Sequence, residues 1–146
     1  MPIQLNPYLS FRGEARDAMT FYQSVFGGQL DVMTFADMGG MGVPDSEAGQ
    51  VMHSALTVSD TVAIFGSDVP STMPGDFPNG RISLSGDDPE TLRRWFDGLA
   101  AQGTVNVPLD KAPWGDWFGD LTDKYGVGWM VNIDGGQTGG QTGGQR

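Results

Sequence analysis

Apolar residues recur at helical spacing in two stretches of the chain. The first stretch is residues 14–26, and Gly27 and Gly28 follow it, as is common after a helix C-terminus. The second begins at Asp88, a residue suited to the N-cap, with Pro89 at the first helical position. Both stretches are predicted to be amphipathic helices with one apolar face.

Short stretches in which apolar and polar residues alternate predict strands on both sides of each helix. The chain reads strand, helix and three strands, and then the same order again. A glycine-rich loop at residues 37–49 and a connection rich in proline and glycine at 68–80 interrupt this order. The predicted strands are residues 3–11, 30–35, 50–58, 61–66, 81–85, 104–109, 117–122 and 128–133.

The two halves superpose in pattern when the chain is shifted by 74 residues. This shift places Tyr8 on Ile82 and Tyr22 on Phe96. One such unit leaves a sheet face without a helix, whereas two units can turn these faces toward a shared cavity. The predicted fold class is α+β, with two βαβββ modules forming a curved, mixed sheet around a cavity.

The module boundaries follow from composition. The predicted modules are residues 1–69 and 81–134, and the linker between them is residues 70–80. Residues 135–146 repeat Gly, Gln and Thr without an apolar side chain, so we expect a disordered tail there.

Composition excludes several classes of protein. The net charge is −10, from 18 acidic and 8 basic residues, whereas nucleic-acid binding needs clustered Lys and Arg. This acidic balance is compatible with a cationic ligand. The absence of cysteine excludes disulfides, thiolate metal sites and cysteine nucleophiles. No apolar run approaches the roughly 20 residues of a membrane helix, and no signal segment is visible. We therefore expect a cytoplasmic protein with no membrane association.

His53 is the single histidine of the chain and lies on a predicted strand. An imidazole suits a general base or a group that orients a ligand. A half-buried, hydrogen-bonded strand residue is the structural alternative.

Aromatic residues are the candidates for ligand contact. The segment from Trp114 to Ile133 holds three of the four tryptophans, among interleaved glycines and aspartates. Such side chains suit either a pocket wall, where they stack on a ligand, or a core. The predicted binding residues are Trp114, Trp117, Trp129, Tyr8 and Phe65.

Two other groups of residues have both a structural and a functional interpretation. Asp116, Asp120 and Asp123 suit turns better than acid–base or cation chemistry, because aspartate is common in glycine-rich loops. Methionines either line an adaptable pocket or fill gaps in the core. The candidates are Met33, Met38, Met41 and Met52.

Three motifs carry a resemblance to a known family: YLSFRGEARDAMTFYQSVFGG at residues 8–28, VMHSAL at 51–56 and WGDWFGDLTDKYGVGWMVNI at 114–133. With the paired βαβββ pattern, they resemble the vicinal oxygen chelate superfamily of glyoxalases, bleomycin-resistance proteins and extradiol dioxygenases. Within it, the chain is similar to the PhnB-like branch, often labelled demethylubiquinone methyltransferase-like. The resemblance implies a homodimer. The sequence lacks the glycine-rich strand-to-helix loop that is usual for binding a nucleotide-like methyl donor.

The resemblance also bears on metal binding. In the metal-using members, His and Glu ligands come from the first and last strands of each module. The matching stretches here are residues 7–11, 62–66, 81–85 and 129–133, and none contains His, Asp or Glu. Asn132 and Ser83 are weak donors for zinc, iron or manganese. We therefore expect no metal and no other cofactor.

Two functions remain. The first is a metal-independent protein of the bleomycin-resistance type, which holds a small molecule in an aromatic-walled cavity. The alternative is an enzyme, such as a lyase, isomerase or dioxygenase-like protein, that acts on a small oxygenated or aromatic metabolite. His53 is its general base.

Overall fold

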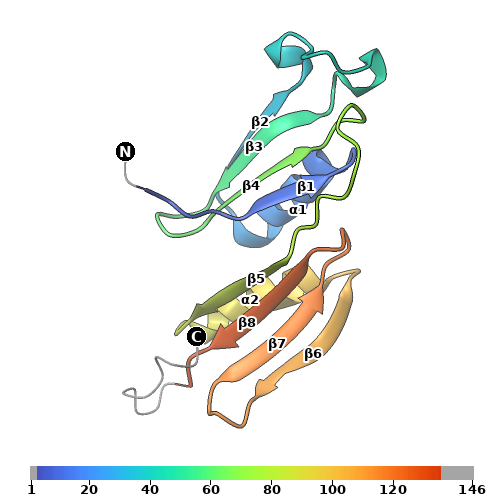
Figure 1. Ribbon diagram of the computed structural model, residues 1–146. Coiled ribbons are helices and arrows are strands. Elements are labelled where there is room, and N and C mark those ends of the chain that lie inside the picture. Colours follow the sequence, from blue (N-terminus) through green and yellow to red (C-terminus); the bar gives the residue numbers. More distant parts are fainter. Residues whose placement is uncertain (1–2, 136–146) are drawn as a thin grey trace. The chain divides into compact units, whose positions relative to one another are not determined.

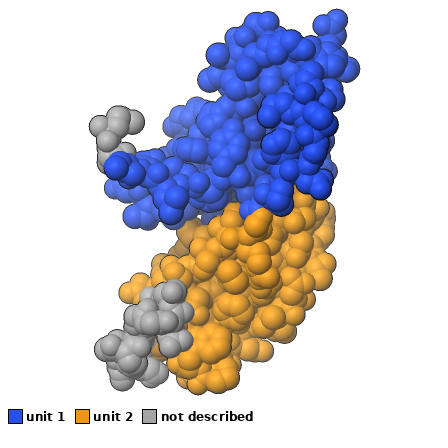
Figure 2. All heavy atoms as spheres, in the orientation of Figure 1, with its two compact units in different colours: residues 1–79 blue, residues 80–146 orange. Residues whose placement is uncertain are grey.

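The computed structural model describes residues 3–135 and contains two compact units, Met1–Asn79 and Gly80–Arg146 (Figures 1 and 2). The division falls at the end of the predicted linker. Apart from Gly135, the predicted tail lies outside the described residues. No helix in the described part of the chain is long and apolar enough to cross a membrane.

The first unit is one four-stranded sheet with a helix on one face (Figure 1). The strand order is β1-β4-β3-β2, in which β1 pairs with β4 in parallel and the other pairs are antiparallel. Two short 3-10 turns, η1 and η2, lie in the loop after β2. The elements are β1 (Tyr8–Phe11), α1 (Ala15–Phe26), β2 (Gln29–Thr34), η1 (Ala36–Met38), η2 (Asp45–Glu47), β3 (Val51–Thr57) and β4 (Ala63–Asp68).

The second unit repeats this arrangement, with strand order β5-β8-β7-β6 and a parallel β5–β8 pair. The predicted α+β class and the βαβββ order of both modules are therefore confirmed. A cavity shared by the modules stays a prediction. The elements are β5 (Arg81–Gly86), α2 (Pro89–Ala100), β6 (Thr104–Lys111), β7 (Trp117–Thr122) and β8 (Gly128–Ile133).

In each unit the helix covers one face of the sheet, and we call the opposite face the far face. A Cβ added at Gly66 of β4 would meet Met19 of α1, and one added at Gly119 of β7 would meet Phe96 of α2. Alternation from these positions assigns the regularly paired strand residues to a face. It does not hold across the pairing irregularities between β2 and β3 and between β6 and β7. The helix-facing positions form the two cores, which include Leu9, Met19, Tyr22, Leu56, Leu99, Leu121, Trp129 and Val131, all fully buried.

The alignment of Tyr8 with Ile82 is wrong by one residue. Tyr8 pairs with Phe65 on the far face, whereas Ile82 pairs with Trp129 on the helix-facing side. Three residues join β1 to α1, and only two join β5 to α2. The offset between the repeats is therefore 75 in the first strand and 74 in the helix.

The first strand is shorter than predicted. It begins at Tyr8 rather than residue 3, and its first pair is Tyr8 with Phe65. In this register residues 3–5 would lie beyond Ala63, where β4 begins, so they have no partner strand. Ile3 and Leu5 lie before the strand and are fully exposed. At the other end, β4 reaches Asp68, two residues beyond the prediction, and places a carboxylate beside the helix N-terminus.

One close backbone approach occurs at equivalent places in both units. A Cβ at Gly28 would collide with the carbonyl oxygen of Thr57, and one at Gly103 would collide with that of Thr122. Each glycine stands just before the second strand of its unit, next to the end of the third. Glycine is needed there because no side chain fits between the two backbones.

Candidate functional site

The first unit contains a pocket of about 360 Å³. Its floor comes from the far-face side of β1, β3 and β4, and its walls come from the loops that follow β2 and β4. Nine of the thirteen lining side chains are apolar or aromatic, which is typical of a small-molecule site. They are Tyr8, Ser10, Phe35, Met41, Val43, Met52, Ser67, Asp68, Val69, Pro70, Thr72, Met73 and Phe77.

Three of the residues predicted for ligand contact or catalysis lie together on the far face, and one of them, Tyr8, lines this pocket. The Tyr8 Oη and His53 Nδ1 atoms are 3.2 Å apart, within hydrogen-bond distance. Phe65 contacts both rings edge-on, with centroid distances of 6.4 Å to Tyr8 and 5.5 Å to His53. The far face thus brings a phenol and an imidazole to one place from separate strands.

Asp68 is a buried carboxylate at the end of the pocket. It is 3% exposed and accepts three backbone N–H groups. Its Oδ1 accepts from Gly13 at 2.7 Å and Ala15 at 3.0 Å, and its Oδ2 accepts from Val51 at 2.9 Å. Two of these donors lie at the start of α1, where backbone N–H groups lack helical partners. Asp68 therefore caps a helix that is distant in sequence.

Arg12 holds the wall that follows β4. Its Nη1 donates to the carbonyls of Val69 and Pro70, and its Nη2 donates to those of Met73 and Gly75, at 2.7–3.2 Å. The guanidinium also lies 5.7 Å from the Phe77 ring centroid. One side chain thus fixes the backbone of four wall residues.

Glu47 joins the two walls. Its Oε1 accepts the Ser71 backbone N–H at 2.9 Å, so the loop after β2 is tied to the loop after β4. The hydroxyl and the backbone N–H of Ser71 hold the pKa of Glu47 below its ordinary value, with a smaller contribution from the charge of Arg12. These bonds favour the ionised carboxylate.

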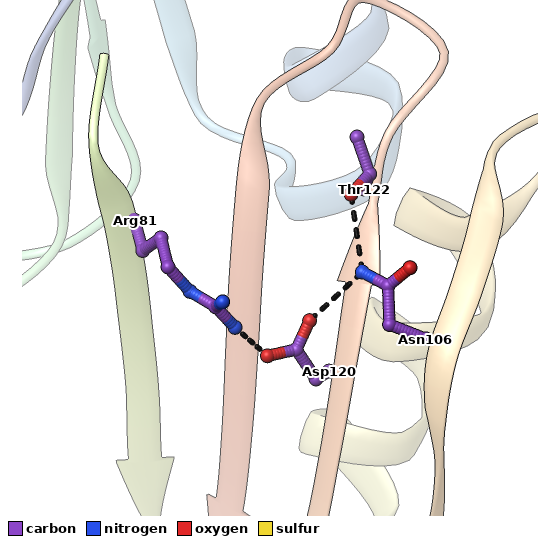
Figure 3. Close-up of polar contacts among 4 residues, drawn as sticks. All are labelled: Arg81, Asn106, Asp120 and Thr122. Atoms are coloured by element: carbon purple, nitrogen blue, oxygen red, sulfur yellow. Dashed lines mark hydrogen bonds and ion pairs between the residues drawn. The ribbon is translucent and has the colours of Figure 1, made fainter. Parts of the chain in front are cut away.

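The far face of the second unit carries a polar cluster instead (Figure 3). Arg81 of β5 forms an ion pair with Asp120 of β7. Asn106 of β6 donates from Nδ2 to Asp120 Oδ1 at 3.0 Å and to Thr122 Oγ1 at 3.1 Å. This cluster ties three strands together and uses the charge of Asp120 within the unit.

The predicted tryptophans all belong to the second unit. Trp129 is 0% exposed, and its Nε1 donates to Asp123 at 2.9 Å, so it is a core residue whose predicted ligand contact stays a prediction. Arg93 lies 4.7 Å from the Trp117 ring centroid, and Trp114 is 47% exposed beside Phe118. Ligand contact by Trp114 and Trp117 stays a prediction.

The neighbouring aspartates support loops, in agreement with the turn interpretation. Asp123 accepts the backbone N–H groups of Tyr125 and Val127 across the β7–β8 turn. Asp116 accepts from Asn132 Nδ2 and from the backbone of Gly135.

The residues do not fit a metal centre of the type found in the metal-using relatives. Within residues 3–135, no three His, Cys, Asp or Glu side chains come together. The rings beside His53 are those of Tyr8 and Phe65, so no second imidazole or carboxylate accompanies it to complete such a ligand set. The absence of a cofactor stays a prediction.

Sequence patterns indicated only part of the pocket. Met41 and Met52 are among the candidate methionines, and both line it, whereas Met33 and Met38 do not. Met73 and Phe77 were missed because their segment reads as a linker. The available signal was three apolar residues, Val69, Met73 and Phe77, at four-residue spacing within that segment.

Two βαβββ units, each closed by a parallel pair of first and last strands, define the paired-module class of fold. A family model described as Glyoxalase/Bleomycin resistance protein/Dioxygenase superfamily matches residues 4–131. The chain belongs to this superfamily, and the resemblance found in the sequence is confirmed.

Relatives cover nearly the whole chain. Protein YjdN of Escherichia coli K12 is 34% identical in an alignment 142 residues long that covers 88% of this chain and 94% of that protein. The structure of protein PA1353 from Pseudomonas aeruginosa is 35% identical, with a TM-score of 0.77 over 91% of this chain and 98% of that one. A PhnB protein from Bacillus cereus is 28% identical, with a TM-score of 0.68 over 90% and 99%.

Proposed function

We propose that this protein binds a small organic molecule in the pocket of the first unit, without a metal. The observation that carries the proposal is a pocket of about 360 Å³ with mainly apolar lining and few polar groups. Pockets of this size and character are the usual sites for small ligands. Membership of a superfamily that includes bleomycin-resistance proteins supports the same function.

A neutral fluorescent probe, N-phenyl-1-naphthylamine, tests the site. We expect its emission to rise on binding, and Phe77→Ala to weaken binding about tenfold, because an apolar wall is lost. Val107→Ala is the control, since Val107 is equally exposed, at 43% against 40%, but lies in the second unit. If Trp117→Ala abolishes binding and Phe77→Ala does not, the site is in the second unit and the proposal is wrong.

Metal independence has its own measurement. Probe affinity is expected to stay unchanged after exhaustive treatment with EDTA. The described residues provide no group of three metal-binding side chains, which supports this expectation. A loss of binding that added zinc or iron restores would contradict it.

The contact between Tyr8 and His53 favours a second candidate, an enzyme in which His53 is a general base. A base must lie within hydrogen-bond reach of the proton that it removes, and the Tyr8 phenol shows that His53 Nδ1 is accessible to a hydroxyl. His53→Ala is expected to abolish turnover of any substrate found while leaving thermal unfolding unchanged. Full activity in that variant would exclude this role.

We also propose a homodimer in the cytoplasm. Ile3 and Leu5 are fully exposed before β1, and an apolar segment of this kind is suited to a second chain. Light scattering is expected to give twice the chain mass of 15.6 kDa, and Ile3→Ser with Leu5→Ser is expected to reduce it to the monomer mass. Cell fractionation tests the location.

A further inference from the structure

Two serine hydroxyls stand side by side in the pocket. Ser10 of β1 and Ser67 of β4 are register partners in the parallel pair, and both line the pocket from the far face. Neither hydroxyl has a hydrogen-bond partner among the described residues, although the backbone of Ser10 is bound by Asn79. Neighbouring strands lie about 4.8 Å apart. One oxygen atom between the two hydroxyls can therefore bond both at about 2.7 Å.

The charged groups around the pocket already have hydrogen-bond partners in the protein. Asp68 is the only carboxylate in the lining, and three backbone N–H groups and the N-terminus of α1 stabilise it. Arg12 donates to four carbonyls of the wall, and Glu47 accepts from Ser71. An anion would lose water here and lie near the carboxylate of Asp68. A cation would also lose water but could not reach a free carboxylate oxygen, because Asp68 is 3% exposed and already accepts three N–H groups.

We propose that the ligand is an uncharged, largely apolar molecule that ends in a hydroxyl or carbonyl oxygen, bound between the hydroxyls of Ser10 and Ser67. This inference rests on the proposed function and narrows its ligand class. It departs from the cationic ligand that the net charge of the chain favoured. The acidic residues determine the charge of the surface, whereas the pocket lining selects the ligand.

The pocket volume sets the size of the probes. At roughly 30 Å³ for each water-sized group, about 360 Å³ accommodates a ligand of about a dozen non-hydrogen atoms. N-phenyl-1-naphthylamine is larger than this, so part of the bound dye is expected to extend from the pocket into solvent. Decan-1-ol, decanoate and decylammonium are of this size and differ only in the polar end. Each is titrated at pH 7 against the bound N-phenyl-1-naphthylamine.

Decan-1-ol is expected to displace the dye at a concentration about tenfold lower than either charged probe. The double variant Ser10→Ala/Ser67→Ala is expected to weaken decan-1-ol binding about tenfold, the effect of losing two neutral hydrogen bonds. The double variant Ser83→Ala/Ser85→Ala is the matched control. Ser85 has the same place in β5 as Ser10 has in β1, but it lies in the other unit. It is expected to bind all three probes as the unaltered protein does.

Each of the other possible results contradicts one part of the proposal. If decanoate or decylammonium binds as well as decan-1-ol, the uncharged class is wrong while the binding function stands. If decan-1-ol keeps its affinity in a folded Ser10→Ala/Ser67→Ala variant, the serine site is wrong. If neither the dye nor any probe binds, the proposed function fails, and this inference fails with it. Thermal unfolding of each variant confirms that it is folded.

Discussion

The two units share one topology but present different chemistry on their far faces. In both, the next-to-last residue of the first strand pairs with the next-to-last residue of the last strand: Ser10 with Ser67, and Ser85 with Asn132. The first far face combines hydroxyls with aromatic rings beside a pocket, whereas the second carries the ion pair of Arg81 and Asp120. Topology thus determines which residues become neighbours, and the individual side chains determine whether these neighbours bind each other or leave room for a ligand.

The units also differ in how the helix begins. Asp88 caps α2 locally, because its carboxylate accepts the Thr91 backbone N–H at 3.1 Å. For α1 the N-cap residue, Glu14, makes no such bond, and Asp68 replaces it from the end of β4. The first helix therefore depends on the completed sheet, whereas the second carries its own cap.

The strongest test of this difference is Asp68→Ala. The change leaves three backbone N–H groups without an acceptor. The bonds of Ala15 and Val51 are buried, and at about 1 kcal/mol or more each their loss costs at least about 2 kcal/mol, whereas the part-buried N–H of Gly13 adds less. Urea unfolding measures it. Asp88→Ala is the matched variant and is expected to cost less, because its cap is exposed to water. An equal loss in both variants would remove the distinction between the two caps.

The next test concerns a feature that the units share. Gly28→Ala is expected to cost about 2 kcal/mol or more, because the added Cβ collides with the Thr57 carbonyl and the backbone has φ +92°. Gly103→Ala is expected to show a similar collision with Thr122. Gly27→Ala is the control. It has φ +78° and ψ −163° but open space around the new Cβ, so backbone strain of about 1–3 kcal/mol applies without a collision. Thermal unfolding that ranks Gly27→Ala with Gly28→Ala would contradict the packing argument.

Arg12→Lys tests the pocket wall. A lysine has no planar fork and cannot bond four carbonyls, so we expect about tenfold weaker binding of N-phenyl-1-naphthylamine. Arg81→Lys in the second unit is the control and is expected to leave the affinity unchanged. Urea unfolding shows whether the variant is still folded, so that a change in the pocket wall alone can be told from a loss of the whole fold. Unchanged probe affinity in a folded Arg12→Lys variant would show that the wall does not need this clamp.

The smallest effect concerns pH. The bonds from Ser71 lower the pKa of Glu47 below its ordinary value of 4.5. The stability that the ionised Glu47 gives to the pocket walls is therefore complete above about pH 4.5 and is lost as the pH falls through the lowered pKa. Probe affinity is expected to fall by less than about threefold on acidification below pH 4. Glu47→Gln should remove this step, because it leaves no group there to titrate. A step of the same size in Glu47→Gln would assign it to another carboxyl.

Local signals were sufficient for much of the fold. Asp88 and Pro89 predicted the start of α2 because a cap and its helix are adjacent in sequence. The hairpin of β7 and β8 was predicted at its observed bounds, since alternation and glycine positions are also local. The start of β1 was predicted wrongly. Ile3 and Leu5 have a strand-like pattern, and only the extent of the partner strand β4 shows that they lie outside the sheet.

The candidate site also has some residues that the sequence predicts and others that it does not. Tyr8, His53 and Phe65 were predicted as individual residues and lie together because strand pairing aligns them. The wall carrying Phe77 was not predicted, because Arg12 organises it from more than fifty residues away. No pattern within a short window contains that information.

The hydrogen bonds between the Asn79 side chain and the Ser10 backbone have a consequence for the protein at high concentration. Strand β1 is at the edge of its sheet, where unpaired backbone groups can recruit an extended peptide from another molecule. The Asn79 amide occupies both groups of Ser10, accepting from its N–H at 2.7 Å and donating to its carbonyl at 3.2 Å. A single amide therefore blocks the addition of a strand at the position of Ser10 on this edge.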